Sequence, residues 1–424
     1  PIAIGSGTLT KGGNGTVTLS GTNTYTGATT ISNGVLIATN ANSLGTTDGA
    51  TTIADGAVLQ ISGGINIGDA INLTGTGEDL AGGIRSTSGN NTLSGLITLG
   101  GTSEIASDAN TLTLDVSTGA ALTGTNRTIK FDGSGNITVN DPITTGSGVV
   151  NKGGSGTLTL SAANTYTGAT NITMGYVAIS NATGLGTTDG ATTVASGATL
   201  KISGGITVAE AITLNGVGRS SSGAIAFTAN DNTYSGAITL GSTSTIVSTG
   251  GAQTISAAIN GGSGLTITAN GNLVVSGAVG GSTALSAYAV TSTGSASQTF
   301  SANITTTGNQ TYTAAGGIVT SGARTFTSNS GTVNFVSALS GDNNVTVTGN
   351  ADIDGAVTSI AVLSISGTSY IGADITTSDT QTYTGAVILS ADVTLTSDGS
   401  IITFSDTVNS ADSTNRDLTV TTGG

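Results

Sequence analysis

The side chains of this sequence that could do acid–base chemistry are carboxylates, because the chain contains neither His nor Cys. Three pairs lie close in sequence: Glu78 with Asp79, Glu104 with Asp108, and Asp352 with Asp354. Two carboxyl groups that flank a glycosidic bond can act as acid and base. Since parallel β-helices host polysaccharide-cleaving enzymes, a sugar-cleaving activity is one hypothesis, and it rests on analogy of fold.

The first pair argues against that hypothesis. Glu78 and Asp79 lie in a turn-like Gly-Thr-Gly-Glu-Asp segment, and a second copy of the segment carries Arg219 and Ser220 instead. The loss of both charges between copies favours solvated loop residues. The chain also lacks Trp and has few basic residues to line a sugar groove, so we expect no catalytic residues.

A calcium site is the second chemical hypothesis. Asp132, Ser134 and Asn136 place oxygen atoms at alternate positions, as cation-binding loops do. The sixth position, where such a loop needs Gly, is Ile137, and no bidentate Glu follows. The pattern is more typical of an Asx-type turn, and we predict no bound metal and no cofactor.

Repeated Thr and Tyr residues suggest two kinds of binding surface. Rows of outward Thr would resemble an ice-binding face, with examples at Thr8–Thr10, Thr16–Thr18, Thr157–Thr159 and Thr394–Thr396. Thr is also a residue that exposed strand positions favour. Tyr25, Tyr166, Tyr234 and Tyr383 could stack against sugars, but we predict that they pack at corners with their hydroxyls turned to water.

Composition excludes several classes of protein. The 424 residues include 68 Gly and only 2 Pro, with 8% charged residues and a net charge of −14. This acidic balance repels nucleic-acid phosphate, so we expect no nucleic-acid partner. No apolar run of the length that a membrane-spanning helix needs is present. The chain opens at Pro1 without Met, which favours a mature or excised piece.

A long internal repeat organises the chain. Residues 11–77 align without a gap with residues 152–218, so that Lys11 matches Lys152. We therefore predict one continuous repeat body over residues 1–424, with repeats at 11–151 and 152–292 and a diverged section at 293–424.

A shorter motif runs through the repeats and reads Asn or Gln, Thr, an apolar residue, then Thr or Ser. Its apolar position is occupied by Tyr25, Leu93, Tyr166, Tyr234, Ile255, Phe300, Tyr312 and Tyr383. Several of the spacings suggest a short, approximate period, although Phe300 and Tyr312 lie too close together to fit it. We interpret these side chains as structural positions of the repeat.

The local pattern predicts short strands and no helix. Short segments alternate Thr or Ser with Val, Ile or Leu, as at Thr16–Leu19 and Val345–Val347, between Gly, Asn and Asp. Such short strands are marginal alone, but coiling lets each strand pair with its equivalent one turn later. The sequence therefore predicts an all-β parallel β-helix of about 18 coils of roughly 23 residues, while an antiparallel sandwich is the alternative fold.

The repeat motif carries a family resemblance. The segments Gly13–Thr29 and Gly154–Thr170 resemble the autotransporter-associated β-strand repeat of bacterial passenger regions, and residues 380–420 are similar to units of filamentous-haemagglutinin-like surface proteins. The resemblance implies a right-handed β-helix exported to the cell surface or released outside the cell.

The expected function is that of a non-enzymatic structural or adhesive stalk. Expected partners are other copies of the chain, through end-to-end stacking, and glycans or proteins of host or neighbouring cells. A polysaccharide-active enzyme and an ice- or glycan-binding module are the alternatives.

Overall fold

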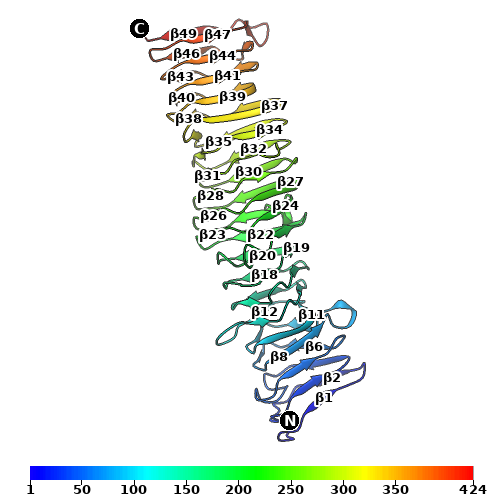
Figure 1. The fold of residues 1–424 in the computed structure, drawn as a ribbon. Helices are drawn as coiled ribbons and strands as arrows, with labels where there is room; N and C mark the ends of the chain where they lie inside the picture. The colour runs from blue at the N-terminus through cyan, green and yellow to red at the C-terminus, as the bar shows by residue number, and fades with distance from the viewer. Residues whose placement is uncertain (424) are drawn as a thin grey trace. The chain divides into compact units, whose positions relative to one another are not determined.

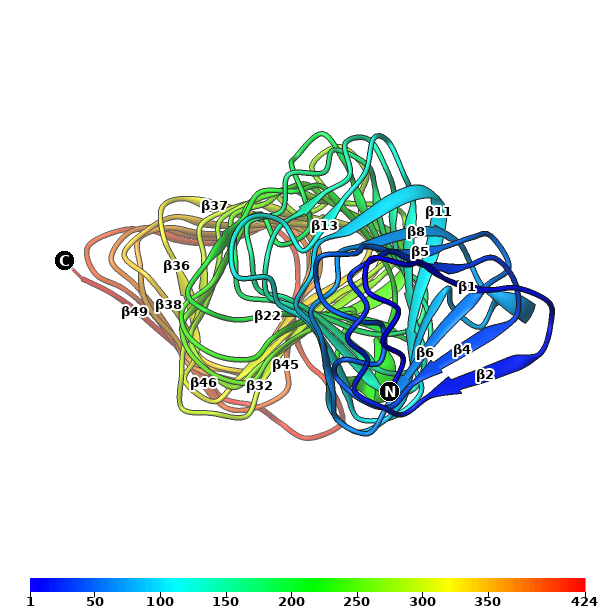
Figure 2. The same cartoon turned by 90° about the horizontal axis from the view of Figure 1, so that it is seen from below.

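The computed structural model describes residues 1–423, in which parallel β-strands account for almost all regular structure. The chain divides into two compact units. The first comprises residues 1–202 with 208–212, and the second comprises residues 203–207 with 213–424. In each unit, successive strands lie side by side turn after turn (Figure 1), and in the end-on view they loop around an interior (Figure 2).

The first unit holds the strands β1 to β22 and a short 3₁₀ segment, η1 (Glu78–Leu80). The strands are β1 (Leu9–Lys11), β2 (Thr16–Leu19), β3 (Thr29–Ile31), β4 (Val35–Ala38), β5 (Thr51–Ile53), β6 (Val58–Ser62), β7 (Asn66–Ile67), β8 (Ile71–Gly75), β9 (Ile84–Ser88), β10 (Asn91–Leu93), β11 (Ile97–Ser107), β12 (Thr111–Leu114), β13 (Leu122–Thr123), β14 (Ile129–Asp132), β15 (Asn136–Val139), β16 (Ile143–Thr144), β17 (Val150–Lys152), β18 (Thr157–Leu160), β19 (Thr170–Ile172), β20 (Gly175–Ile179), β21 (Thr192–Val194) and β22 (Ala198–Ile202).

Strands β23 (Thr207–Val208) and β24 (Ile212–Gly216) contain the residues at which the division falls, and η2 (Arg219–Ser221) follows them. The later strands are β25 (Ile225–Phe227), β26 (Thr233–Tyr234), β27 (Ile238–Ser248), β28 (Gln253–Ile255), β29 (Ile259–Asn260), β30 (Leu265–Ala269), β31 (Leu273–Val275), β32 (Tyr288–Ser292), β33 (Gln298–Phe300), β34 (Ile304–Thr306), β35 (Gln310–Ala314), β36 (Ile318–Thr320), β37 (Arg324–Phe335), β38 (Leu339–Ser340), β39 (Val345–Ile353), β40 (Val357–Ile360), β41 (Leu363–Ile365), β42 (Ser369–Ile371), β43 (Ile375–Thr377), β44 (Gln381–Tyr383), β45 (Val387–Leu389), β46 (Val393–Ser397), β47 (Ile402–Phe404), β48 (Val408–Ser410) and β49 (Leu418–Thr422).

Aliphatic side chains of equivalent strands stack into columns inside each unit. In the first unit Leu36 pairs with Leu59, and Leu59 pairs with Ile84, all through parallel ladders. All three side chains are buried. Because strand side chains alternate between faces, the intervening Gln60 and Arg85 point outward, and burial of the apolar half holds the turns together.

Aromatic rings fill part of the interior of the second unit. Phe300, Tyr312, Phe326 and Phe335 are fully buried. Tyr312 stacks on Phe335 of the next turn with ring centroids 5.2 Å apart, and Phe326 packs edge-on against Phe335 at 5.2 Å. Each such ring adds a large apolar area to the interior.

The parallel β-solenoid with essentially no helix is confirmed, but the predicted coil is too long. The fold has about 20 turns of about 21 residues, where the sequence predicted fewer and longer coils. The turns also vary in length, because Val357 pairs with Ile375 in a short turn whereas Ile71 pairs with Ile97 in a much longer one. The corners between strands change length, so no strict period exists in the sequence.

Phe300 and Tyr312 lie too close together to fit the period of the motif, and the structure gives the reason. Phe300 lies in β33 and pairs with Thr320 of β36, whereas Tyr312 lies in β35 and pairs with Phe335 of β37. The two strands belong to different sheets of the same coil. The same motif therefore occurs on strands of two different sheets of the solenoid.

Among the described residues, no helix has the length and apolar character needed to cross a membrane.

Candidate functional site

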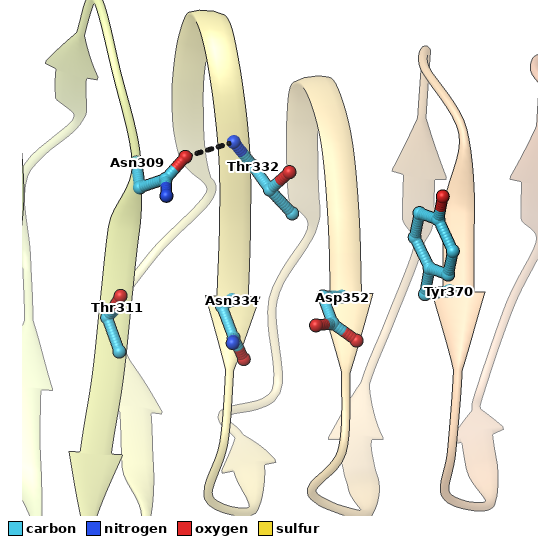
Figure 3. Close-up of a pocket in the computed structure, with 6 residues that line it drawn as sticks. All are labelled: Asn309, Thr311, Thr332, Asn334, Asp352 and Tyr370. Atoms are coloured by element: carbon cyan, nitrogen blue, oxygen red, sulfur yellow. Dashed lines mark hydrogen bonds between the residues drawn. The ribbon is translucent and has the colours of Figure 1, made fainter. Parts of the chain in front are cut away.

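A hollow on the outer face of the second unit is a candidate site. It lies over four stacked strands, in which Thr311 of β35 pairs with Asn334 of β37, Asn334 with Asp352 of β39, and Asp352 with Tyr370 of β42. The side chains of these positions point outward, because their neighbours Tyr312, Phe335, Ile353 and Ile371 fill the interior. Figure 3 shows the four in a row.

One wall of the hollow is held by a backbone contact between turns. The backbone N–H of Thr332 donates to Oδ1 of Asn309 over 3.0 Å (Figure 3). Asn309 and Thr332 complete the lining of a cavity of about 290 Å³. This volume lies at the lower limit for ligand pockets, which typically measure about 300–1,000 Å³.

The polar groups of the hollow are poorly satisfied within the protein. Oδ1 of Asn334 is buried and accepts no hydrogen bond from the described residues. Burial raises the pKa of Asp352, and the neighbouring Asp354 adds to that rise. Within residues 1–423 the ion pairs involve neither of these two carboxylates.

Asp352 and Asp354 do not meet in the hollow as a catalytic pair. Asp352 faces the hollow, Ile353 points into the core, and Asp354 is exposed beyond the end of β39. Only Asp352 lines the cavity. The arrangement offers one acceptor and one neighbouring amide, which suits binding of hydroxyl groups.

The other two predicted carboxylate pairs lie in the first unit, in different settings. Glu78 and Asp79 are exposed in η1. Glu104 is 2% exposed, and Nζ of Lys130 lies 3.3 Å from its Oε2. Burial raises the pKa of Glu104, and the Lys130 ammonium opposes that rise. Asp108 accepts from Nε of Arg85 at 2.8 Å, so each carboxylate of this second pair has its own cation.

The oxygen atoms of the predicted calcium loop serve separate contacts. Oδ2 of Asp132 lies 2.5 Å from Nζ of Lys130. Burial acts to raise the pKa of this carboxyl, but the Lys130 ammonium, the Gly133 backbone N–H and the charge of Lys152 together lower the pKa below its usual value. The hydroxyl of Ser134 donates to the backbone oxygen of Asp108, and Oδ1 of Asn136 accepts from the backbone of Thr157. Over residues 1–423, no group of three or more Asp or Glu side chains could hold a metal ion.

Two of the predicted Thr rows are interrupted. Thr138 pairs with Thr159, but the next turn brings Ala178 to that position. Thr16 and Thr18 face Val35 and Ile37. A flat Thr array of the kind that an ice-binding face would need is interrupted at these places.

The tyrosines of the motif lie inside the solenoid, together with Leu93 and Phe300. The buried motif side chains are Tyr25, Leu93, Tyr166, Tyr234, Phe300, Tyr312 and Tyr383. The prediction that tyrosine hydroxyls turn to water is wrong. The Tyr25 hydroxyl lies 2.7 Å from Oγ1 of Thr29, and Tyr312 donates to Oε1 of Gln310 over 2.7 Å. In both cases the hydroxyl finds a polar partner close along the chain.

Sequence reasoning missed a buried lysine in each repeat. Lys11 is 6% exposed, and its ammonium donates to the backbone oxygens of Gly13 at 2.7 Å and Asn33 at 2.8 Å. Lys152, 3% exposed, repeats the contact with Gly154 at 2.8 Å. The ammonium ties its own corner to the next turn. The recurrence of the same Lys-Gly-Gly corner at equivalent places of the two repeats was the available signal.

A buried asparagine ties three turns together in the same way. Oδ1 of Asn23 accepts from the backbone of Ile2 at 2.7 Å, and its Nδ2 donates to the oxygen of Ser43 at 2.6 Å. Asn164 makes the equivalent contacts one repeat later at 2.8 and 2.6 Å. Such an amide satisfies backbone groups that the corners would leave unpaired.

Each repeat also holds a buried carboxyl group. Asp69 accepts from the hydroxyl of Thr51 at 2.9 Å, and Glu210 accepts from the hydroxyl of Thr192 at 2.6 Å. Both are 3% exposed. Burial raises the pKa of Asp69 to about 6 and that of Glu210 to about 7, although the threonine hydroxyls act in the opposite direction.

The family comparison matches the segments that carry the buried lysines and the Tyr–Thr pairs. The passenger-associated-transport-repeat family matches residues 9–38 and 150–179, which contain both buried lysines and both Tyr–Thr pairs. The two matches and the β-solenoid confirm the resemblance to the repeat body of an autotransporter passenger. They fit a passenger stalk. No curated protein and no solved structure matches the chain.

Proposed function

We propose that the chain is a non-enzymatic structural segment of a secreted or surface-exposed bacterial passenger, acting as a stalk. The observation that carries the proposal is the turn-on-turn parallel stacking with two matched transport repeats. In such a stack each turn is stabilised by its neighbours, so that turns can be added or removed in register. Surface exposure is the setting in which passenger repeats of this family occur.

An in-register deletion tests this proposal. Removing residues 11–151 joins Thr10 to Lys152, which takes the place of Lys11 in the repeat. The expected product keeps a parallel-β circular dichroism spectrum and a urea midpoint close to that of the full chain. Removing residues 11–141 instead joins Thr10 to Pro142 and breaks the register, so this control is expected to lose part of its β-structure. Equal behaviour of the two deletions would count against length-additive stacking.

The enzymatic and ice-binding alternatives have direct assays. Incubation with neutral and acidic polysaccharides is expected to release no new reducing or unsaturated ends, because the three candidate carboxylate pairs lie in unrelated settings. Thermal hysteresis is expected to be absent, because the rows at Thr16–Thr18 and Thr157–Thr159 are broken by Val35, Ile37 and Ala178.

We further propose that copies of the chain associate end to end through strand edges, which pair readily with another strand. Val420 of β49 pairs with the buried Leu395 of β46 and continues its inward column. Sedimentation at rising concentration is expected to reveal association that Val420→Lys abolishes. A monomer at all concentrations would contradict this part of the proposal.

A further inference from the structure

We propose that the hollow lined by Thr311, Asn334, Asp352 and Tyr370 binds a neutral saccharide. This inference goes beyond the stalk function and does not depend on it, since it concerns a surface and not the stacking. It rests on an exposed ring, a carboxylate outside any ion pair and a charge pattern that occur together in one place.

The first observation is the exposure of the Tyr370 ring. It is 40% exposed, whereas Tyr25, Tyr166 and Tyr312 are fully buried. Tyr176, by contrast, is only partly exposed, and its ring lies 3.7 Å from Nζ of Lys201. A solvent-facing ring at the end of a polar hollow offers a flat apolar surface for the C–H face of a sugar.

The second observation concerns hydrogen bonding. Asn334 and Asp352 occupy neighbouring strands in direct register, a separation of about 4.8 Å between strands. The carboxylate of Asp352 lines the hollow and belongs to none of the ion pairs within residues 1–423. Sugar hydroxyls can donate to this carboxylate, and the outward side chain of Asn334 on the neighbouring strand lines the same hollow.

The third observation is the charge around the hollow. Asp352 faces it, Asp354 lies close by, and no cation of residues 1–423 pairs with either carboxylate. The whole chain carries a net charge of −14. A uronic acid or sialic acid would bring a second anion against Asp352, which favours neutral sugars over acidic ones.

The fourth observation is rigidity. The four side chains stand on paired strands, and the Asn309–Thr332 hydrogen bond fixes the adjoining corner. Side chains held on a sheet lose little conformational freedom when a ligand binds. This lowers the free-energy cost of binding a ligand that makes few contacts.

Saturation-transfer NMR on the full chain tests the proposal. The probes are the methyl glycosides of glucose, galactose and mannose, with cellotetraose, and trigalacturonate is the acidic counterpart. At least one neutral probe is expected to receive saturation from the protein, and trigalacturonate is expected to receive none. Tyr370→Ala and Asp352→Asn are each expected to lower the affinity for the neutral probe by about tenfold or more. Tyr370→Phe is expected to keep the affinity of the unaltered chain.

Tyr176→Ala is the matched control, since it removes an outward tyrosine that belongs to the first unit and does not line the hollow, and it is expected to leave binding unchanged. Circular dichroism checks that each variant is folded. If Tyr370→Ala does not fold, the near-isosteric Asp352→Asn still tests the proposal. The proposal is overturned if no neutral probe binds, if trigalacturonate or a mixed peptide pool binds instead, or if Asp352→Asn binds as well as the unaltered chain.

Discussion

The hydroxyl of Tyr166 lies 2.8 Å from Oγ1 of Thr170 inside the solenoid, and the same pair occurs at Tyr25 and Thr29 over 2.7 Å. The Thr170 hydroxyl donates its own proton to the backbone oxygen of Leu185 at 3.0 Å. Tyr166 is therefore the donor to Thr170. Burial raises the pKa of Tyr166, so this proton is retained throughout the physiological range.

Tyr166→Phe is expected to lower the free energy of unfolding by about 1 kcal/mol, because it removes one buried hydrogen bond and keeps the ring. Tyr166→Ala is expected to cost about 3–5 kcal/mol, since it also leaves a cavity. Urea unfolding followed by circular dichroism measures both. Tyr176→Phe on the outer face is the control, and an equal loss there would contradict the assigned role of the buried hydroxyl.

Lys152→Met is expected to destabilise the first unit by about 1–3 kcal/mol. The methionine fills a similar volume but leaves the corner carbonyls, such as that of Gly154, without their donor. The matched control is Lys201→Met, because Nζ of Lys201 lies over the Tyr176 ring on the surface. Comparable losses of the urea midpoint for both variants would show that the buried ammonium has no special role.

The buried carboxyls predict a stability that falls as pH rises. The pKa of Asp69 is raised to about 6 and that of Glu210 to about 7 in the folded chain, whereas both groups titrate near pH 4 when unfolded. Between about pH 4 and 7 the unfolded chain releases these protons first. Each group therefore removes up to about 3 kcal/mol of stability over that window.

Asp69→Asn and Glu210→Gln test this directly, because amides retain the size of each group without its titration. The double variant is expected to have a flatter dependence of the urea midpoint on pH across the window from mildly acidic to neutral, and to gain stability above neutral pH. A pH profile parallel to that of the unaltered chain would contradict the prediction.

Close backbone contact at one corner predicts a glycine requirement. A Cβ at Gly156 would collide with the backbone oxygen of Gly135 one turn earlier, whereas a Cβ at Gly12 would meet nothing. Gly156→Ala is therefore expected to cost about 1–3 kcal/mol, since the corner must shift. Gly12→Ala is expected to be neutral. Thermal unfolding of the two variants measures the difference, and similar midpoints would contradict the packing of this corner.

The class of fold could be predicted from the sequence, because alternating Thr and aliphatic residues and a long internal repeat leave few other ways to bury a core. The burial of Lys11 and Lys152 could not be predicted, because lysine is seldom buried and nothing local marks the carbonyl oxygens that accept hydrogen bonds from its ammonium group.

The hollow could not be predicted either. Thr311 meets Asn334 across a longer stretch of chain than the one that separates Asp352 from Tyr370. Because corner lengths vary from turn to turn, register cannot be counted from a period. The sequence marks Asp352 only as half of a carboxylate pair. Its neighbours in space, Asn334 and Tyr370, are identified only from the pairing of the strands.

Spin labels at neighbouring turns test the central feature, the parallel stack, most directly, because the chain contains no cysteine of its own. Thr138 and Thr159 are outward register partners, and Ala178 and Thr113 continue the row on either side. Nitroxides introduced through cysteines at 138 and 159 are expected to broaden each other strongly, at a strand separation of about 4.8 Å. The broadening is expected to decrease for 138 with 178 and further for 113 with 178. Unbroadened spectra from the 138–159 pair, or broadening that does not fall along the row, would contradict the stack.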